Sequence, residues 1–449
     1  MTVLENLKEF LRIPSISTSA AHAADCRRAA EWVCRHLPGS RLIEKDGHHP
    51  LVYAEYLGAP GMPTLLLYGH YDVQPPEPLE LWTSPPFEPT IRGEDLFARG
   101  ACDDKGQTLI LLEALRQCNG RPPVNIKVLI EGEEEANGEH LEAYVCSHAE
   151  ELKADAALIC DTEMFAKGLP TLCTGLRGGV FGELHVEGAA QDLHSGVYGG
   201  AAPNAVEAVA QIIAALKGVD GVVRVPGFYD AVSAPSSEEL AAWKTLPFDE
   251  SEYLRTEVGS SSLTGEAGFS VLERTWARPT LEVHGIVGGY VSPGFKTVIP
   301  ARAHAKISCR LVPDQEPSKI VELLRAAIAE ATPRGVVSRF DVLGSSPACL
   351  VNPGHPILRA AASALEETFG KPTVYMRSGG SIPVVGLFQR ELGIPSVLMG
   401  FGLPDDNLHA PNEKFHLPNL DSGIEAVTRF FEILTTIPAR HSGQFLHRK

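Results

Sequence analysis

Carboxylates and imidazoles follow several apolar segments of this sequence at the positions where those segments end. The apolar run at residues 128–130 leads into Glu131, a glycine and three consecutive glutamates, Glu133, Glu134 and Glu135. A short apolar run of this kind is typical of a buried strand in a parallel sheet, and open α/β sheets bind their ligands at the carboxyl ends of such strands. Adjacent carboxylates in a cleft repel one another and resist desolvation, so we expect cations, shared protons or bulk water to offset their charge.

Three further segments bring polar side chains to the same predicted edge. Apolar runs end at His70 and at Asp161, and Asp103 stands just before a predicted helix at residues 108–116. A single buried histidine is more often an ordinary core residue, and a single aspartate at the start of a helix is commonly a cap. The meeting of four such segments at one sheet edge favours a shared site instead.

These residue types predict a site for two metal ions. Imidazoles and carboxylates without thiolates suit zinc, manganese or cobalt, and one carboxylate can bridge two such ions. The candidate ligands are one of the glutamates together with His70, Asp103, Asp161 and His409. Two divalent cations would then offset three carboxylates and a bridging hydroxide. Such a pair of ions makes the water between them more acidic and polarises a carbonyl group.

A second glutamate, one that binds no metal, would take the proton of that water and pass it to a leaving amine. General-base help of this kind is worth about 10²-fold to 10⁴-fold in rate. The residues alone do not decide whether base and ligand are drawn from Glu133 and Glu134 or from Glu134 and Glu135.

The elements that must position these residues predict an α/β fold with two domains. Strands alternating with helices indicate a mainly parallel sheet in residues 1–177, and the same pattern returns in residues 351–449. Residues 178–350 contain alternating strand patterns typical of an antiparallel α+β unit, so the smaller domain is inserted into the larger one. We assign no element within residues 219–275, which are polar and weakly periodic.

Length and composition limit the class of protein. A chain of 449 residues is long enough for two domains, and no apolar run approaches the ~20 residues needed to span a bilayer. The net charge of −17 argues against nucleic acid as a partner. The nine cysteines lack CxxC spacing, which fits buried free thiols better than disulfide bonds or a zinc site of cysteines. The N-terminus lacks the charged-then-apolar order of a signal peptide. We therefore expect a cytoplasmic protein with no membrane partner. No strand opens into GxGxxG, which excludes a Rossmann-type dehydrogenase.

Six motifs in register resemble one known family. They are residues 69–75 (Gly-His-Tyr-Asp-Val-Gln-Pro), 99–106 (Arg-Gly-Ala-Cys-Asp-Asp-Lys-Gly), 131–135 (Glu-Gly-Glu-Glu-Glu), Asp161, 192–200 (Asp-Leu-His-Ser-Gly-Val-Tyr-Gly-Gly) and His409. In this order they resemble the dinuclear zinc peptidase and amidohydrolase family, which includes carnosinase, the cytosolic nonspecific dipeptidase, aminoacylase, acetylornithine deacetylase and succinyl-diaminopimelate desuccinylase. The likeness spans nearly the whole chain, and residues 192–200 look most like the dipeptidase branch. It implies a catalytic domain of the zinc-exopeptidase type, an inserted lid and dimerisation domain, and a homodimer.

The resemblance also implies a role for each metal-site residue. His70 and Asp161 would hold one metal, Glu135 and His409 the other, and Asp103 would bridge the two.

Three features around these ligands are implied as well. Asp72 would orient His70, Glu134 would be the general base, and the peptide bond between Asp103 and Asp104 would be cis.

Further residues are implied in the substrate site. His194 would reach a partner subunit's site and stabilise the oxyanion, and Arg310 would bind the C-terminal carboxylate of the substrate. Thr297 and Ser381 would add carboxylate contacts, and Gly380 would let backbone amides approach.

The expected function is hydrolysis of the amide bond of dipeptides or short peptides with a free C-terminal carboxylate. The expected cofactors are two divalent ions per chain, zinc in the first place, with manganese or cobalt as alternatives. An N-acyl-amino-acid deacylase on the same scaffold is the first alternative. The second is an inactive relative that serves as a binding module, and the intact set of predicted ligands argues against it.

Overall fold

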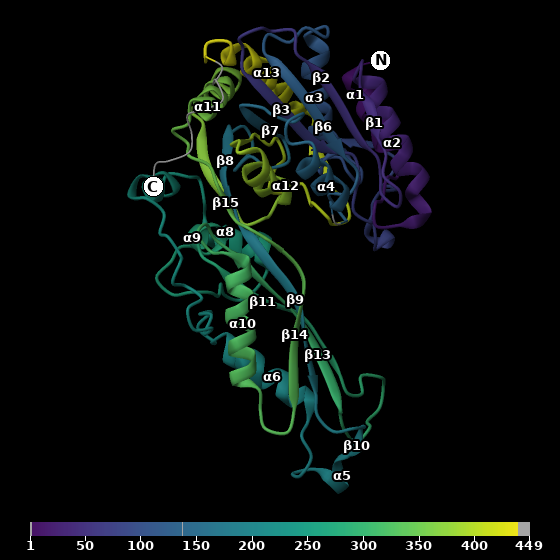
Figure 1. The fold of residues 1–449 in the computed structure, drawn as a ribbon, viewed down its shortest axis with the longest axis vertical. Coiled ribbons are helices and arrows are strands. Elements are labelled where there is room, and N and C mark those ends of the chain that lie inside the picture. Colours follow the sequence, from purple (N-terminus) through teal and green to yellow (C-terminus); the bar gives the residue numbers. More distant parts are fainter. Residues whose placement is uncertain (1, 137, 439–449) are drawn as a thin grey trace. The chain divides into compact units, whose positions relative to one another are not determined.

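The computed structural model describes residues 2–136 and 138–438, and the chain folds into two compact units (Figure 1). Unit 1 comprises Met1–Thr174, Val351–Met376 and Leu387–Lys449, and unit 2 comprises Gly175–Leu350 and Arg377–Gly386. The predicted α/β class, with a mainly parallel sheet and a separate antiparallel sheet, is confirmed. The unit boundaries differ from the expected domain boundaries in one segment. Arg377–Gly386 lies within the range 351–449 expected for the larger domain, but it belongs to unit 2.

The sheet of unit 1 has a parallel centre. Its strand order is β1-β2-β6-β3-β7-β17-β8, in which β6, β3, β7 and β17 run parallel to their neighbours in this group, whereas β1, β2 and β8 are antiparallel. The central strands are buried along almost their whole length, which explains their continuous apolar sequences. The strands are β1 Arg41–Ile43, β2 Leu51–Tyr56, β3 Thr64–His70, β6 Asn125–Glu131, β7 Ala156–Ile159, β8 Thr171–Leu176 and β17 Ser396–Leu398, with β16 Val374–Ser378 also paired to β8 and β15 Cys349–Leu350 at the end of β8.

Helices surround this sheet, and one of them is buried on all sides. Helix α3 (Lys105–Gln117) lies against β3, α1 and α13, and every residue from Lys105 to Leu115 is buried. The other helices of this unit are α1 Val3–Leu11, α2 Ala23–His36, α4 Glu139–Ser147, α11 Pro356–Phe369 and α13 Leu417–Leu434. A small sheet, in the order β18-β5-β4 (Lys414–His416, Asp95–Phe97 and Thr90–Arg92), brings the chain before α13 next to the chain before α3.

Unit 2 is built on an antiparallel sheet. Its order is β11-β13-β9-β14 (Thr280–Gly288, Arg302–Leu311, Gly178–Glu187 and Val337–Ser346), and helices α6 (Ala205–Leu216) and α10 (Pro317–Ala331) pack against it. The core between them contains Leu184, Val209, Ile212, Ile307 and Leu324. After β9 the chain forms the short strand β10 (Leu193–His194) and the short helix α5 (Ser195–Tyr198). Strand β10 pairs with β12 (Val298–Ile299) in a two-stranded antiparallel ladder. Helix α12 (Pro383–Leu387) lies at the boundary of the units in the sequence.

The stretch that the sequence left unassigned contains short helices. These are α7 (Ser237–Trp243), α8 (Glu250–Tyr253) with a π-helical turn at Leu254–Val258, and α9 (Val271–Trp276). None of the nine cysteines, all of which lie in the described part of the chain, forms a disulfide bond, as predicted, and six of them are buried. Among the described residues, no helix has the length and apolar character needed to cross a membrane.

Candidate metal centre

Strand register brings the predicted ligands of the central sheet to one level. On β3, His70 lies opposite Glu131 of β6, and Tyr68 lies opposite Ile159 of β7. Because parallel strands advance together, Asp161, two residues after Ile159, emerges level with His70. The three glutamates that follow β6 emerge at the same edge.

The start of α3 brings Asp103 to this edge. Asp104 accepts hydrogen bonds through Oδ2 from the His70 amide at 3.1 Å and from Thr108 Oγ1 at 2.7 Å. A side chain on Gly69 would lie 2.2 Å from Thr108 Oγ1, so only glycine lets the helix approach β3 so closely. The peptide bond between Asp103 and Asp104 is cis, which confirms that expectation.

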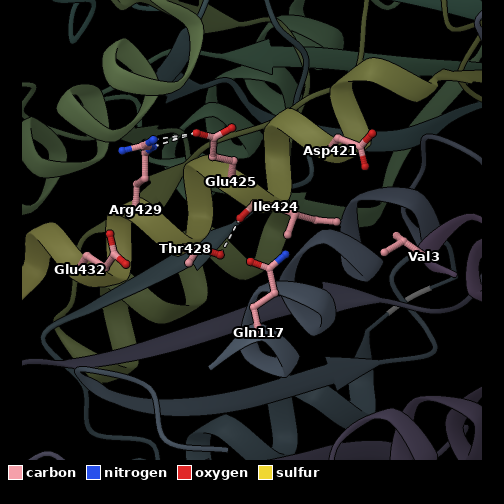
Figure 2. A pocket seen from close by; sticks show the side chains of 8 residues that line it. All are labelled: Val3, Gln117, Asp421, Ile424, Glu425, Thr428, Arg429 and Glu432. Atoms are coloured by element: carbon pink, nitrogen blue, oxygen red, sulfur yellow. Dashed lines mark hydrogen bonds and ion pairs between the residues drawn. The ribbon is translucent and has the colours of Figure 1, made fainter. Parts of the chain in front are cut away.

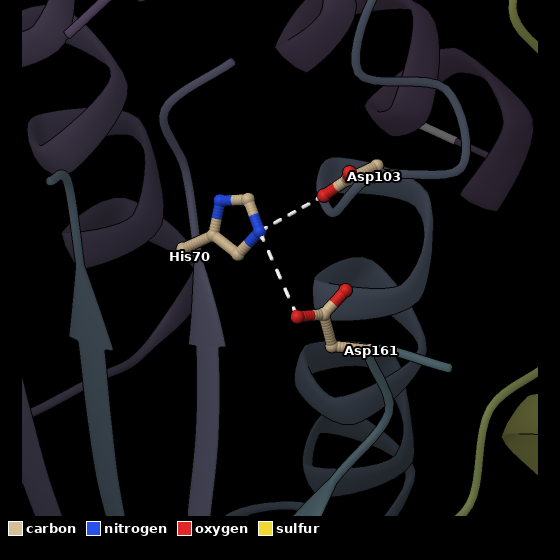
Figure 3. A group of neighbouring side chains, drawn as sticks. All are labelled: His70, Asp103 and Asp161. Atoms are coloured by element: carbon tan, nitrogen blue, oxygen red, sulfur yellow. Dashed lines mark hydrogen bonds and ion pairs between the residues drawn. The ribbon is translucent and has the colours of Figure 1, made fainter. Parts of the chain in front are cut away.

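The five predicted ligands form two groups that share one aspartate. In the first group, His70 Nε2 lies 3.0 Å from Asp103 Oδ1 and 4.0 Å from Asp161 Oδ2 (Figure 3). In the second, His409 Nε2 lies 2.8 Å from Asp103 Oδ2 and 3.1 Å from Glu135 Oε1. Within each group the ligand atoms all lie within 4.8 Å of one another. Asp103 therefore offers one oxygen to each group, which is the geometry of a bridging ligand.

Asp72 contacts one residue of each ligand group. Its Oδ1 lies 3.3 Å from His70 Nδ1, and its Oδ2 accepts a hydrogen bond from the Glu135 amide at 3.0 Å. Gln74 Nε2 donates to the other carboxylate oxygen of Glu135, Oε2, at 2.7 Å. These contacts orient the imidazole of one group and the carboxylate of the other.

The electrostatics of these residues fit two divalent cations. Burial and the charges of Asp104 and Asp103 raise the pKa of Asp161 well above its usual value. Hydrogen bonds with Asp103 and Glu135 raise the pKa of His409 to about 10. These shifts favour the protonated forms of Asp161 and His409, and cations can take the place of those protons. The two ligand groups consist of imidazoles and carboxylates. The nearby Cys102 belongs to neither group and is fully buried, which raises the pKa of its thiol well above the usual value.

The three consecutive glutamates have different surroundings. Glu133 accepts a hydrogen bond from the His49 amide at 2.8 Å and lies 3.1 Å from His48 Nδ1, so it is held by the protein itself. Glu135 belongs to the second ligand group. Glu134 lies between them, and burial together with the charges of Asp103 and Glu135 raises its pKa well above the usual value. This arrangement favours Glu134 as the base and Glu135 as the ligand.

Glu413 is a site residue that the sequence reasoning missed. Its carboxylate is fully buried and accepts four hydrogen bonds, from the amides of Gly100, Cys102 and Asp103 at 2.8, 2.9 and 3.1 Å and from Arg99 Nη1 at 2.8 Å. It therefore holds the loop that presents Asp103. Its position four residues after His409 was the only available signal, and an acidic residue in a loop is usually exposed to solvent.

The predicted residues of unit 2 form two separate pairs. Arg310 Nη1 donates to Ser381 Oγ at 2.8 Å, next to Gly380, whose carbonyl accepts from the Arg177 amide at 3.1 Å. Thr297 Oγ1 lies 3.3 Å from Nε2 of His194, which is exposed. Thr297 therefore contacts His194 and not Arg310.

A surface hollow of unit 1 contains none of the predicted residues. It lies along α13 beside Val3, the first residue of α1, and Gln117, the last residue of α3 (Figure 2). Arg429 in this hollow pairs with Glu425 of the same helix at 2.8 Å, and both side chains are exposed. We assign no function to it.

Comparison with known proteins identifies the family. The model of Peptidase family M20/M25/M40 matches residues 66–433. The chain belongs to this family. The predicted resemblance, with its likeness to the dipeptidase branch, and the prediction of a metallopeptidase are thereby confirmed.

Two curated relatives show the extent of the likeness. The Cys-Gly metallodipeptidase dug1 of Schizosaccharomyces pombe is 30% identical, over 96% of this chain and 95% of the relative. The Beta-Ala-His dipeptidase of Rattus norvegicus is 31% identical, over 88% of this chain and 81% of the relative.

Two solved structures share the fold over nearly the whole chain. The M20 family metallo-carboxypeptidase Sso-CP2 from Sulfolobus solfataricus has a TM-score of 0.86 and 31% identity, covering 97% of this chain and 100% of that one. Human carnosine dipeptidase 1 has a TM-score of 0.84 and 28% identity, covering 97% and 96%.

We predict that the protein saturated with zinc binds two ions per chain, measured by mass spectrometry of the metal content after removal of free zinc. Asp161→Asn should reduce this number to one, because it removes a ligand of the first group only, and Asp103→Asn should weaken both sites. Asp95→Asn is the control, since Asp95 also contacts a histidine, His416, at 2.8 Å but belongs to neither group. Two ions retained in the Asp103 variant at wild-type affinity would contradict the shared-ligand geometry.

Proposed function

We propose that this protein is a metal-dependent dipeptidase that hydrolyses the peptide bond of dipeptides or short peptides with a free C-terminal carboxylate. The observation that carries the proposal is the pair of ligand groups sharing Asp103. Glu134 is close enough to interact electrostatically with Asp103 and Glu135 of these groups. The names of the curated relatives, which are metallodipeptidases and dipeptidases, support the same reaction.

The chemistry follows from the placement of the side chains. Two divalent ions held by His70, Asp161, Asp103, Glu135 and His409 would supply Lewis acidity to the attacking water and to the scissile carbonyl. Glu134 accepts the proton of the water and delivers it to the nitrogen of the leaving amine. Asp72 keeps His70 in the orientation that points Nε2 at the site. Imidazole and carboxylate donors suit zinc, which we propose as the metal, with manganese or cobalt as substitutes.

Arg310 is the proposed contact for the substrate's C-terminal carboxylate. Its guanidinium donates to Ser381 and lies over the ring of Phe181 at 5.4 Å, and within the described chain it forms no ion pair. A planar guanidinium with free donors binds a carboxylate through two parallel hydrogen bonds. Ser381 and Gly380 would complete this contact, whereas Thr297 acts with His194.

We also propose a cytoplasmic homodimer in which His194 serves the partner's active site. The lack of disulfide bonds among the nine cysteines, all of which the structure describes, fits a reducing compartment. The apolar residues of α6 pack inside unit 2, so they do not form an exposed dimerisation surface. The stronger support is a set of exposed apolar side chains on unit 2, namely Val197, Tyr198, Ile286, Val287, Tyr290, Val291 and Phe295.

A substrate panel separates the proposed function from the deacylase alternative. With zinc, manganese or cobalt, the pure protein should hydrolyse Cys-Gly, β-Ala-His and simple dipeptides at least 100-fold more efficiently than N-acetyl or N-succinyl amino acids. Tripeptides in the panel test for carboxypeptidase action on longer chains. Faster release of acetate or succinate than of amino acids would replace the proposal by the deacylase.

Glu134→Gln should lower kcat by about 10²-fold to 10⁴-fold, because it removes the general base. The metal content should stay at two ions per chain, since Glu134 is not a proposed ligand. Glu133→Gln is the matched control and should keep kcat within about threefold, because the described residues that hydrogen-bond to the Glu133 side chain are His48, His49 and His140, which belong to neither ligand group. An inactive Glu133 variant beside an active Glu134 variant would reverse the assignment.

Mixed dimers test the role of His194. His194→Ala and Glu134→Gln should each be nearly inactive alone, because one loses the oxyanion contact and the other the base. Co-expressed chains should regain activity, since a mixed dimer then has one site with an intact Glu134 and a partner's intact His194. Absence of recovery in a mixture shown by ultracentrifugation to be dimeric would place His194 outside the partner's site.

A further inference from the structure

Residues 219–275, which so far have no role, supply the partner of a buried arginine. Arg377 Nε donates to Glu239 Oε1 and Arg377 Nη2 donates to Glu239 Oε2, each at 2.7 Å. Only 5% of Arg377 is exposed, and its guanidinium lies 5.6 Å from the ring centre of Trp243 on the same helix, α7. A two-pronged pair of this kind fixes the orientation of both side chains.

Arg377 begins the turn that carries the proposed carboxylate contacts. In this turn Ser378 Oγ accepts from the Gly380 amide at 3.1 Å. Ser381 Oγ accepts from Arg310 Nη1 at 2.8 Å and donates to the carbonyl of Arg177. The position of the Ser381 hydroxyl therefore depends on the path of the chain from Arg377 to Ser381.

The turn also has close backbone contacts on both sides. A side chain on Gly379 would lie 2.8 Å from Arg177 Nη2 and 3.0 Å from the carbonyl of Thr275, which belongs to α9. A side chain on Gly175 would lie 3.1 Å from Arg377 Cγ. Trp243 and Trp276 pack edge to face at 5.2 Å, which joins α7 to α9 beside this turn. Two helices of the otherwise unassigned stretch, α7 and α9, thus meet the turn.

The ion pair with Glu239 also distinguishes Arg377 from Arg310 as a binding partner for anions. Glu239 occupies two donors of Arg377 with a full negative charge, so this guanidinium has little attraction left for another anion. Arg310 has one serine hydroxyl as its hydrogen-bond partner and no carboxylate among the described residues. A substrate carboxylate near this turn is therefore directed to Arg310 and not to Arg377.

We propose that Glu239, acting through Arg377, is a positioning residue for the substrate-carboxylate contacts at Gly380 and Ser381. Residues 237–276 are then a brace for the substrate site. This inference rests on the proposed peptidase function and adds to it the element that sets the preference for a free C-terminal carboxylate.

The test compares Glu239→Gln with a matched variant in the same stretch. Glu266 and Arg278 form a similar two-pronged pair, at 2.6 and 2.8 Å, and its arginine lies against Tyr229 and Phe269 and not against the turn. For a dipeptide, Glu239→Gln should raise KM about tenfold and leave kcat within about twofold, because binding geometry changes and the base does not. For the corresponding dipeptide amide, which lacks the carboxylate, kcat/KM should stay within about twofold. Glu266→Gln should change neither substrate, and Arg377→Lys should reproduce Glu239→Gln because lysine cannot form the two-pronged pair.

A second measurement does not depend on turnover. Hydrogen exchange followed by mass spectrometry should show the peptide covering residues 377–386 exchanging about tenfold faster in Glu239→Gln than in wild type, with no change in Glu266→Gln. Unchanged exchange there, or equal losses for the dipeptide and its amide, would overturn the positioning role. If wild type hydrolyses no dipeptide while the exchange result holds, the proposed function fails and the brace remains as a structural element.

Discussion

The mutual repulsion of carboxylates at one sheet edge is the constraint on which the site depends. Asp103, Glu134, Glu135 and Asp161 are gathered there with two imidazoles, and burial makes their charges costly. Direct contacts between His70, His409 and Asp103 offset part of this cost. Divalent cations bound there would offset it further and would supply the Lewis acidity of the proposed peptide hydrolysis. On the proposed function, the crowding that destabilises the edge would thus favour binding of metal.

Surrounding hydrogen bonds keep these anions in place. Glu413 accepts four hydrogen bonds from the loop that carries Asp103, and Asp72 contacts one residue of each ligand group. Neither carboxylate belongs to a ligand group. Their contribution is orientation, which matters because a metal site tolerates only small displacements of its ligands.

Unit 2 supplies contacts of a different kind, based on arginine. Arg310 keeps free donors, whereas Arg377 is neutralised by Glu239. On the proposed function, this division between an available and a saturated guanidinium would direct a substrate carboxylate to Arg310 and not to Arg377. It would also give a role to the polar stretch between α6 and β11, which contains the short helices α7, α8 and α9.

The sequence by itself determined the fold class, the ligand types and their meeting at one edge, because strand periodicity and the residues that follow each strand are local properties. His70, Asp103, Asp161, His409 and an unspecified member of the glutamate run were proposed as ligands from the residues, and the structure brings these four residues together with Glu135. The residues alone did not distinguish the three glutamates; the family resemblance implied Glu135 as the ligand, and the tertiary contacts of Glu133 with His48 and His49 set Glu133 apart from the other two. The tertiary structure also revealed two carboxylates with distant partners. Glu413 accepts a hydrogen bond from the amide of Asp103, 310 residues away in the sequence, and Glu239 pairs with Arg377, 138 residues away. Partners separated by such distances share no local pattern, so only the folded chain decides which carboxylate lies against which donor.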